Sequence, residues 1–563
     1  MNSNEHALAR AQWQPVLFAE RPSRLELLKL KPGWPLASCN IRVHRNHASE
    51  HMAAAAEAWF NWAGRTAKFL HSDYDDSLSF AFDDQEKAQL EIVWLDLGRY
   101  AGRFDSSALV DWLKSRLIAL RARTNAPILL VALDASDEQH NALQKASKEL
   151  PGVRWADLRP INALLGSKFY DERAARFSGT RLSDQASVLV ARELACRWAP
   201  AAILPRIKAV AIDLDHTLFE GVLGEDGDQV RLTPAHAELH RHFLSLREQG
   251  IFLALVSRNE AADVRELFEA RKDFPLRWEH FSATAISWGS KADGLRAVAK
   301  SLRIAEDAVL FVDDNPGELM TVTMELPQVR TVHALPDANA TRRALEYFPG
   351  LWAWERSATD AIRAADLEAE TERARLAAQS MDPMEYLRCL EVKLRIVITP
   401  HEHLGRLQEL SQKTNQFNLN LERLSEVDFS QRLDSPEHRV AIIALSDKLS
   451  DSGFIGLVVA RRDQNVLTIE ELTISCRALG RRLEDLMIGE AIRAIREELP
   501  AARIQALHRT APRNGPAREW LAKFAAQTLP AEGCVDITTA VEQVSKDSYP
   551  VALEITHHES LRN

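Results

Sequence analysis

The sequence predicts an α/β protein of several domains, in which two parallel-sheet regions precede a C-terminal α+β region. Short apolar runs alternate with helical patterns over most of the first 350 residues, as in a parallel sheet with helices on both faces. From about residue 385 the pattern changes to successive strands followed by late helices. The chain has 563 residues, more than one hydrophobic core normally serves. We therefore expect segments 1–200, 201–350 and 385–563, with a helical linker at 351–384.

The composition argues against a nucleic-acid-binding or membrane-spanning protein. The chain has 80 acidic and 70 basic residues, whereas a nucleic-acid-binding surface would be basic. No apolar stretch approaches the ~20 residues that cross a bilayer, and the polar start Met1–Glu5 is not typical of a signal peptide. The five cysteines show no metal-ligand or disulfide spacing. We expect a cytoplasmic enzyme without nucleic-acid or membrane partners.

Apolar runs and helical patterns alternate within the first segment. The runs are 90–97, 127–133 and 153–156, and the helical patterns are 106–121 and 183–198. This alternation predicts a parallel sheet for the N-terminal segment.

Polar side chains in the second segment stand where predicted strands end or a helix begins. Asp213 and Asp215 follow the apolar run 209–212. The later elements are Ser257 after the run 251–256, Lys291 at the start of a helix-like stretch, and Asp313 with Asp314 after the run 308–312. An Asp-x-Asp pair alone could equally be a loop cap or a structural acid. The four elements in this order favour a phosphoryl-transfer site.

These residue types suit a phosphatase that works with Mg. Asp213 can attack phosphorus and form an aspartyl-phosphate, and Asp215 can protonate the leaving oxygen and later activate water. Asp213, the backbone carbonyl of Asp215 and Asp313 offer the hard oxygen ligands that Mg prefers. Ser257 and Lys291 would bind the phosphoryl oxygens. We find no Gly-x-x-x-x-Gly-Lys-[Ser/Thr] loop for ATP.

The gaps between these elements leave little room for a lid domain. Between the first aspartates and Ser257 lie a Gly-rich loop and the predicted helix 234–248, and between Ser257 and Lys291 only another helix and a short strand. An open site favours substrates carried on another protein, an inference by analogy between folds.

The third segment carries a second set of candidate residues. Its predicted strands are 391–397, 439–445, 457–460 and 467–472, and its charged linker helix, 357–379, has the pattern of a solvated helix. Cys476 precedes Arg477–Arg482 and the predicted helix 483–496. Positive charge and a helix N-terminus would favour a reactive thiolate, although a buried strand-end cysteine is the simpler interpretation from composition.

Four motifs together resemble the haloacid dehalogenase superfamily of phosphatases and, within it, the FkbH-like branch (subfamily IIIC). They are the stretches 213–227, 312–318, 412–419 and 475–481, and the resemblance covers about residues 207–531. His216 stands where an Asn is usual, Glu220 where a Gly is usual, and Arg482 where the family tends to carry Gly. These departures leave the fine substrate preference open.

The resemblance implies a fold for each segment. The middle segment would be a capless Rossmann-like phosphatase core, and the C-terminal segment a GNAT-like acyltransferase domain with a pyrophosphate-binding turn that starts a helix. The N-terminal segment would resemble SGNH hydrolases. Its first strand leads into Arg45–His47 rather than a Gly-Asp-Ser turn, so we expect a docking or scaffolding role there.

The resemblance also implies a function, the loading of a glyceryl unit onto an acyl carrier protein in polyketide-type biosynthesis. Cys476 would capture a phosphoglyceryl group from the acyl phosphate of bisphosphoglycerate, and the Asp213 site would remove the remaining phosphate. The acyl or pantetheine group would lie near Arg477, Gly480, Arg481, Asn415 and Asn514. The polar runs 413–418 and 509–514 could instead be helix and turn caps.

Two alternatives remain open at this point. One is a Mg-dependent phosphatase whose GNAT-like domain only binds a partner. The other is a carrier-protein docking scaffold with vestigial catalysis, which the intact set of Asp213, Asp215, Ser257, Lys291 and Asp313 disfavours.

Overall fold

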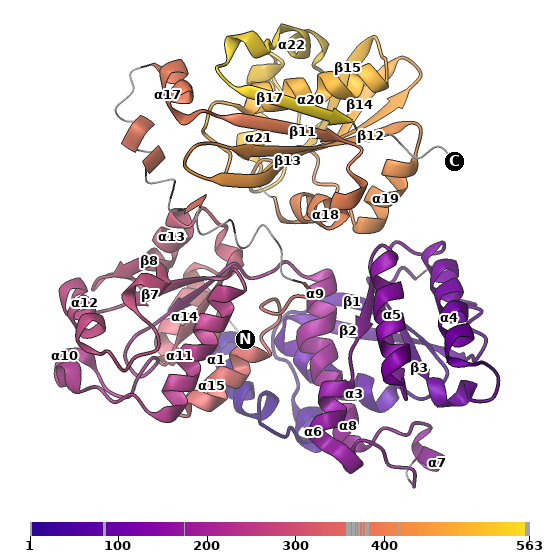
Figure 1. The fold of residues 1–563 in the computed structure, drawn as a ribbon. Helices are drawn as coiled ribbons and strands as arrows, with labels where there is room; N and C mark the ends of the chain where they lie inside the picture. The colour runs from indigo at the N-terminus through magenta and orange to yellow at the C-terminus, as the bar shows by residue number, and fades with distance from the viewer. Residues whose placement is uncertain are drawn as a thin grey trace. The chain divides into compact units, whose positions relative to one another are not determined.

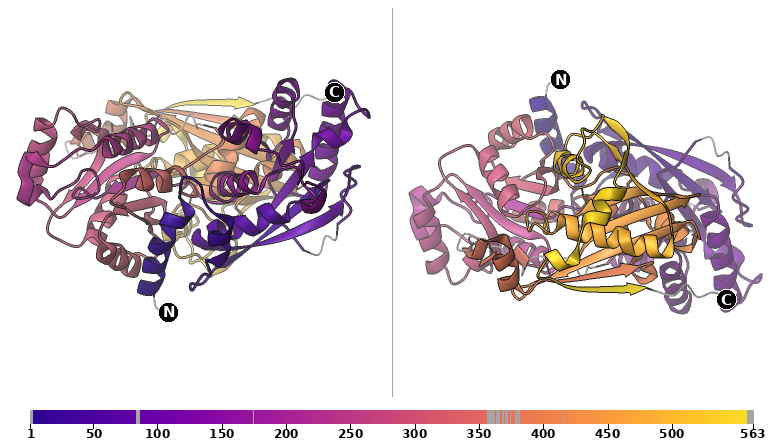
Figure 2. Two further views of the ribbon diagram at one scale, coloured as in Figure 1. Left: turned by 90° about the horizontal axis from the view of Figure 1, so that it is seen from below. Right: turned by 90° about the horizontal axis from the view of Figure 1, so that it is seen from above.

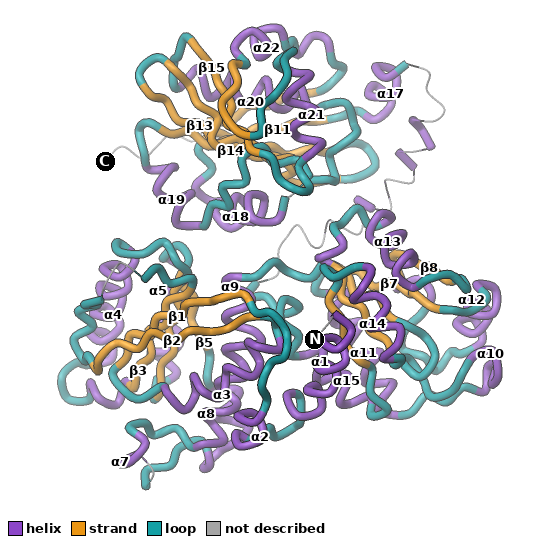
Figure 3. The backbone as a smooth tube through the Cα atoms, turned by 180° about the vertical axis from the view of Figure 1, so that it is seen from behind, coloured by secondary structure: helices purple, strands orange, loops and turns teal. Residues whose placement is uncertain are grey.

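The computed structural model describes residues 3–82, 86–173, 175–355, 382–414 and 416–557, and single positions between 362 and 377. The chain divides into two compact units, 1–356 and 357–563. The described residues form three sheets, two in the first unit and one in the second (Figure 3). The domain boundaries predicted at residues 200, 350 and 384 stay predictions. None of the helices in the described part of the chain combines the length and hydropathy that a bilayer crossing requires.

The first sheet has five parallel strands in the order β2-β1-β3-β4-β5. They are β1 (Ala37–Arg45), β2 (Arg65–Tyr74), β3 (Leu90–Asp96), β4 (Ile128–Leu133) and β5 (Val153–Ala156). Two helix pairs cover it, α3 (Glu50–Trp62) with α8 (Asp184–Glu193), and α4 (Ser106–Arg121) with α5 (Asp137–Glu149). Trp94 packs in the cluster with α3 and Leu95 in the cluster with α4, so β3 is buried on both faces. The predicted parallel sheet between two helix layers is confirmed.

The second sheet has five parallel strands in the order β10-β9-β6-β7-β8. They are β6 (Ala209–Ile212), β7 (Phe252–Ser257), β8 (Phe281–Ile286), β9 (Val309–Asp313) and β10 (Arg330–His333). Helix α11 (Pro234–Glu248) packs on α15 (Ala338–Glu346), and α13 (Lys291–Ser301) packs on α14 (Pro316–Glu325) (Figure 1). All four residues of β6 are buried, as the central strand of a covered parallel sheet requires.

The N-terminal helix α1 (Ser3–Leu17) packs on helices of both sheets: Trp59 and Trp62 of α3 donate to its carbonyls at Leu17 and Arg10. It packs on α14. Gln14 Nε2 donates to the carbonyl of His333 (2.6 Å), and the backbone N–H of His333 donates to Gln14 Oε1 (3.1 Å). Val43 of β1 and Val210 of β6 belong to one continuous hydrophobic cluster. The two sheets of this unit therefore share a core.

Shorter helices join these elements in the first unit. They are α2 (Arg24–Lys29), α6 (Arg159–Leu165), α7 (Ala175–Ser178), α9 (Ala199–Ile203), α10 (Leu223–Asp226) and α12 (Ala261–Ala270). The helix predicted at 183–198 is α8, followed by a π-helical turn, Leu194–Trp198.

The third sheet has seven strands in the order β16-β15-β14-β13-β12-β11-β17 and mixes parallel with antiparallel pairs. Its strands are β11 (Lys393–Ile398), β12 (His438–Ser446), β13 (Asp451–Asp463), β14 (Val466–Ile474), β15 (Arg503–Arg509), β16 (Glu532–Asp536) and β17 (Ala552–His557). Its helices are α17 (Pro383–Leu390), α18 (Leu404–Lys413), α19 (Glu426–Asp434), α20 (Glu484–Glu498), α21 (Gly515–Phe524) and α22 (Thr538–Gln543). The change near residue 385 to successive strands is confirmed, since β12, β13 and β14 follow one another without an intervening helix.

Helices cover both faces of the third sheet. Ile443 of β12 packs in the cluster that contains α20, whereas Ile442 packs in the cluster with α18 and α19. Figure 2 shows the late helices, drawn in orange to yellow, over the sheet. Adjacent residues of one strand therefore face different helices, which is the period-2 pattern of a strand.

Of the charged positions described in the stretch predicted as a solvated linker helix, Glu372 and Arg375 are solvated, whereas Asp366 and Arg373 are not. The side chains of Glu372 and Arg375 are 41% and 59% exposed, and those of Asp366 and Arg373 are 4% and 2% exposed. The charge pattern led to a wrong prediction at Asp366 and Arg373 because both side chains find buried partners of opposite charge.

Candidate active site

The predicted phosphoryl-transfer residues meet at one edge of the second sheet. Strands β9, β6 and β7 are neighbours, and Asp313, Asp213 and Ser257 stand at their carboxyl ends. Helix α13 begins at Lys291, where the hydroxyl of Ser290 accepts a hydrogen bond from the N–H of Ala292 (3.1 Å). Parallel strands place their carboxyl ends together, so the order in the sequence becomes proximity in space.

Lys291 joins the two buried carboxylates of this edge. Its Nζ lies 2.9 Å from Asp213 Oδ1 and donates to Asp313 Oδ2 (2.5 Å). The side chains of Asp213, Lys291 and Asp313 are 6%, 6% and 0% exposed. Burial alone would lower the pKa of Lys291, but the charges of the two aspartates raise it. The amine therefore stays protonated and is available to a phosphoryl oxygen.

Three carboxylates gather around this amine. Asp213, Asp313 and Asp314 each offer one oxygen, and these oxygens all lie within 4.8 Å of one another. Burial and the charge of Asp313 raise the pKa of Asp213 to about 6. Burial also raises the pKa of Asp313 and of Asp314, and Asp213 adds to the shift of Asp314. A single lysine does not offset the repulsion within this group, which is the environment that a divalent cation stabilises.

Asp314 was named in the sequence only as the neighbour of Asp313, and its place in the carboxylate group was missed. The side chain of Asp215, by contrast, is not in that group. A ligand role for the Asp215 carbonyl stays a prediction.

Asp215 is held in place by two donors. Its Oδ1 accepts from the backbone N–H of Leu223 (2.8 Å), and its Oδ2 accepts from Asn259 Nδ2 (2.9 Å). The same amide donates to Ser257 Oγ (3.1 Å), and Asn259 is 5% exposed. Sequence reasoning missed Asn259, although it follows Ser257 by only two positions.

The loop after Asp213 is shaped by unusual backbone angles. His216 has φ 52°, a left-handed conformation that Asn, Asp and His adopt more readily than most residues with a Cβ. At Gly221, with φ 116°, a Cβ would come within 2.6 Å of Asp226 Oδ2. Glu220 pairs with Arg231 through both backbone and side chain. The departures at His216 and Glu220 are thus accommodated within the loop.

Every residue from 213 to 291 is described, and the elements there are short. Helices α10 and α11 lie between β6 and β7, and helix α12 lies between β7 and β8. The open, lid-free site stays a prediction.

Cys476 lies at the start of the turn that joins β14 to α20. It is half-buried and directly follows β14 and Ser475, and α20 begins at Glu484, eight residues later. The N–H of Gly480 donates to Glu484 Oε1 (2.8 Å). The helix therefore starts within one residue of the predicted position 483, and the reactivity of the Cys476 thiol stays a prediction.

Two of the predicted acyl-binding residues make buried contacts with other parts of the C-terminal unit. Asn514 is fully buried; its Oδ1 accepts from the N–H of Ala511 (2.9 Å), and its Nδ2 donates to the carbonyls of Asn418 (3.1 Å) and Arg509 (2.8 Å). Arg481 is 6% exposed and pairs with Asp366 and Asp447. Arg477 is half-buried, Gly480 is exposed, and Asn415 lies outside the described residues.

The polar run 413–418 leads into a segment that lies between two diverging strands. Strand β14 pairs with β15 only as far as Ile469. Beyond that point, Ile474 N–H donates to the carbonyl of Phe417, Leu419 N–H donates to that of Leu472, and Arg509 N–H donates to that of Leu419. This segment occupies the gap between the strands, which favours the structural interpretation of the motif.

The N-terminal sheet places one serine after its first strand. Ser49 precedes α3, its Oγ lies 3.0 Å from His71 Nδ1, and it is 1% exposed. A hydroxyl at this burial cannot meet a substrate without rearrangement. The docking or scaffolding role stays a prediction.

No family model and no curated protein matches the chain. Among solved structures it is similar to the N-terminal part of a Bacteroides fragilis protein that contains a phosphatase domain complexed with Mg, with 17% identity, a TM-score of 0.44, and coverage of 62% of this chain and 100% of that one. A spermidine N-acetyltransferase mutant from Vibrio cholerae matches with 15% identity, a TM-score of 0.18, and coverage of 24% of this chain and 77% of that one. Likeness at this level does not bear on activity, which has to be argued from the site itself.

Proposed function

We propose that the edge formed by β6, β7 and β9 is the active site of a Mg-dependent phosphatase of the haloacid dehalogenase type. The observation that carries the proposal is the buried group of Asp213, Lys291 and Asp313, with Lys291 Nζ 2.9 Å from Asp213 Oδ1 and 2.5 Å from Asp313 Oδ2. A protonated amine beside a carboxylate nucleophile suits the binding of a phosphoryl group.

The reaction divides into two displacements. Asp213 attacks phosphorus, the bond between phosphorus and the ester oxygen breaks, and Asp215 gives its proton to the leaving alcohol. Asp215 then takes a proton from water, whose oxygen attacks the aspartyl-phosphate and releases inorganic phosphate. Asn259 holds the Asp215 carboxylate through this exchange. Ser257 Oγ accepts a hydrogen bond from Asn259 Nδ2, so the Ser257 hydroxyl can donate its own proton to a phosphoryl oxygen.

The carboxylate group fits a magnesium ion. Asp213, Asp313 and Asp314 supply hard oxygen donors. Their pKa values are raised because the carboxylates are buried close together and Lys291 alone does not balance their charge. When bound, Mg would neutralise charge on the phosphoryl oxygens.

We further propose that the complete chain transfers a glyceryl unit to an acyl carrier protein, as the FkbH-like resemblance implies. The Cys476 thiolate would attack the acyl carbon of bisphosphoglycerate, and the acyl phosphate would leave as inorganic phosphate. Hydrolysis at Asp213 would remove the second phosphate. The carrier's phosphopantetheine thiol would then attack the thioester and release Cys476. The half-buried thiol at the end of β14 supports this scheme, and the family's biosynthetic role and a cytoplasmic location are part of the proposal.

Intact-protein mass spectrometry after incubation with bisphosphoglycerate tests both proposals. With Mg we expect a glyceryl adduct, and with a chelator a phosphoglyceryl adduct, because acyl capture by a thiol needs no metal. A dephosphorylated adduct in the presence of chelator would contradict this division between the two sites. Release of phosphate without any adduct would favour a plain phosphatase whose C-terminal domain binds a partner.

A further inference from the structure

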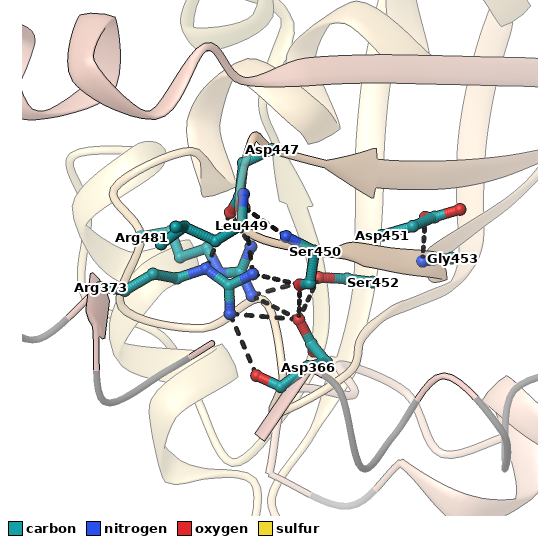
Figure 4. Close-up of polar contacts among 9 residues, drawn as sticks. All are labelled: Asp366, Arg373, Asp447, Leu449, Ser450, Asp451, Ser452, Gly453 and Arg481. Atoms are coloured by element: carbon teal, nitrogen blue, oxygen red, sulfur yellow. Dashed lines mark hydrogen bonds and ion pairs between the residues drawn. The ribbon is translucent and has the colours of Figure 1, made fainter. Parts of the chain in front are cut away.

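Four charged side chains and two serine hydroxyls meet inside the C-terminal unit (Figure 4). Asp366 and Arg373 come from the segment before α17, Asp447 from the turn between β12 and β13, and Arg481 from the turn after β14. Their side chains are 4%, 2%, 1% and 6% exposed, in that order. The hydroxyls belong to Ser450 and Ser452.

Arg373 and Asp447 form the fixed half of this cluster. Arg373 Nε and Nη2 lie 2.8 and 3.2 Å from the two oxygens of Asp447, which is a bidentate pair. Asp447 Oδ1 also accepts from the backbone N–H groups of Leu449 (2.9 Å) and Ser450 (3.0 Å). Asp447 Oδ2 also lies 3.3 Å from Arg481 Nη1, so the carboxylate of Asp447 is committed to its own turn and to both arginines.

Asp366 forms the other half, and one of its oxygens carries most of the contacts. Its Oδ1 accepts from the hydroxyls of Ser450 (2.7 Å) and Ser452 (2.8 Å) and lies 3.1 Å from Arg373 Nη1 and 3.4 Å from Arg481 Nη2. Burial alone would raise the pKa of Asp366, but the hydrogen bond from Ser450 and the charge of Arg481 lower it. Two hydroxyls and two guanidinium groups around one anionic oxygen are the surroundings of a bound oxyanion.

We propose that Arg373, Arg481, Ser450 and Ser452 form a binding site for the phosphate of a phosphate ester, and that Asp366 occupies this site as an internal anion until the ester displaces it. The exchange replaces a buried carboxylate of one negative charge with a phosphate ester of about −1.5 to −2 at pH 7, so the two arginines always face an anion. Arg373 remains paired to Asp447, and the serines and Arg481 pass from a carboxylate to a phosphate. The site lies in the unit that carries Cys476, but the proposal does not depend on the reaction there or at Asp213.

Anion binding to the full-length chain tests the site. Isothermal titration of Asp366→Ala with inorganic phosphate, 3-phosphoglycerate and phosphopantetheine should show binding tighter than in the wild type by about tenfold or more, because no internal anion has to leave. Asp366→Asn keeps the shape and removes only the charge, and it should show a smaller gain. Asp451→Asn removes a charge from an exposed position of the same turn and should leave binding unchanged.

The double variant Asp366→Ala with Arg481→Gln should bind the probes no more tightly than the wild type. Phosphate binding at the Asp213 edge is the same in every variant and therefore cancels in the comparison. A gain only with phosphopantetheine would assign the site to the carrier arm, and a gain only with 3-phosphoglycerate would assign it to the substrate. If neither Asp366 variant binds any of the three probes more tightly while both unfold at the wild-type temperature, the proposal is wrong. It is also wrong if the gain survives Arg481→Gln.

Discussion

The two candidate sites of this chain differ in how their residues relate to the fold. At the edge of the second sheet, Asp213, Ser257, Lys291 and Asp313 come from separate elements and converge on one place. Around Cys476 the residues are neighbours in sequence, yet Gly480 and Arg481 are engaged with Glu484, Asp366 and Asp447.

The difference follows from the geometry of the two settings. The carboxyl ends of adjacent parallel strands share one edge, so a residue placed after each apolar run is brought to its partners by the sheet. A turn after a strand imposes no such convergence, and each side chain there takes the nearest partner. Because the residues of the first site converge, we expect large losses of phosphatase activity when they are replaced. The proposal of acyl transfer at Cys476 has less structural support, so it is the one that experiments test most severely.

The largest effect is expected for Asp213→Asn. An amide of the same shape cannot attack phosphorus, so phosphate release should fall by about 10⁴-fold or more. The measurement is phosphate release with Mg, with circular dichroism as the control for folding. Turnover of a phosphate ester at the wild-type rate would mean that the sheet edge is not the active site.

The second prediction tests the Cys476 turn. Cys476→Ala should remove covalent loading and delivery to the carrier protein, because the thiol is the proposed acyl acceptor, and it should leave hydrolysis of a small phosphate ester unchanged. Peptide mapping by mass spectrometry locates the adduct. Cys534→Ala is the matched control, since Cys534 is exposed and not part of the turn. Full loading by Cys476→Ala would show that transfer is direct or that the chain is a plain phosphatase.

A third prediction separates the two aspartates of the first site. Asp215→Asn should lower kcat by about 10²–10⁴-fold, the usual contribution of a general acid and base. The loss of kcat in Asp215→Asn should be smaller for an ester whose leaving alcohol is strongly acidic, because that alcohol departs without being protonated. Equal losses for good and poor leaving groups would assign Asp215 a structural role instead.

The sequence predicted the sheet edge well because each residue there is fixed by local pattern. The apolar runs located β6, β7 and β9, and the residue after each run is the one that reaches the shared edge of the sheet. Asn259 and Asp314 were missed because their roles depend on side-chain direction within a loop, which periodicity does not reveal. Asp366 was misjudged because a charged residue in a helical pattern looks solvated unless its buried partners, here Ser450 and Arg481, are known.

The fourth prediction concerns Asn259 as a positioning residue. Asn259→Ala removes the donor shared by Asp215 and Ser257 and should lower kcat by about tenfold, with little change in KM. Asn259→Asp should be worse than Asn259→Ala and should move the pH–rate profile, since it places a negative charge beside Asp215. Identical profiles for the two variants would indicate that Asn259 only supports the fold.

The smallest expected effect is on stability. Asp213→Asn, which should abolish catalysis, should make the metal-free chain more stable. In the metal-free chain, burial and Asp313 raise the pKa of Asp213 from 3.8 to about 6. Between these values the folded state binds more protons than the unfolded state, so the free energy of unfolding falls as the pH rises from about 4 to about 6. Asp213→Asn lacks this titration.

We therefore expect metal-free Asp213→Asn to be more stable than the wild type at pH 7.5, by about 1–3 kcal/mol, and the difference to shrink toward pH 4. Urea unfolding with a chelator at both pH values measures it, and Asp228→Asn, at an exposed position, is the control for removing one charge. Added Mg should narrow the gap at pH 7.5, because it stabilises only a folded chain that keeps all three carboxylates. A variant less stable than the wild type at pH 7.5 would mean that the attraction between Asp213 and Lys291 outweighs the cost of burying the carboxylate, and the group would then need no cation to be stable.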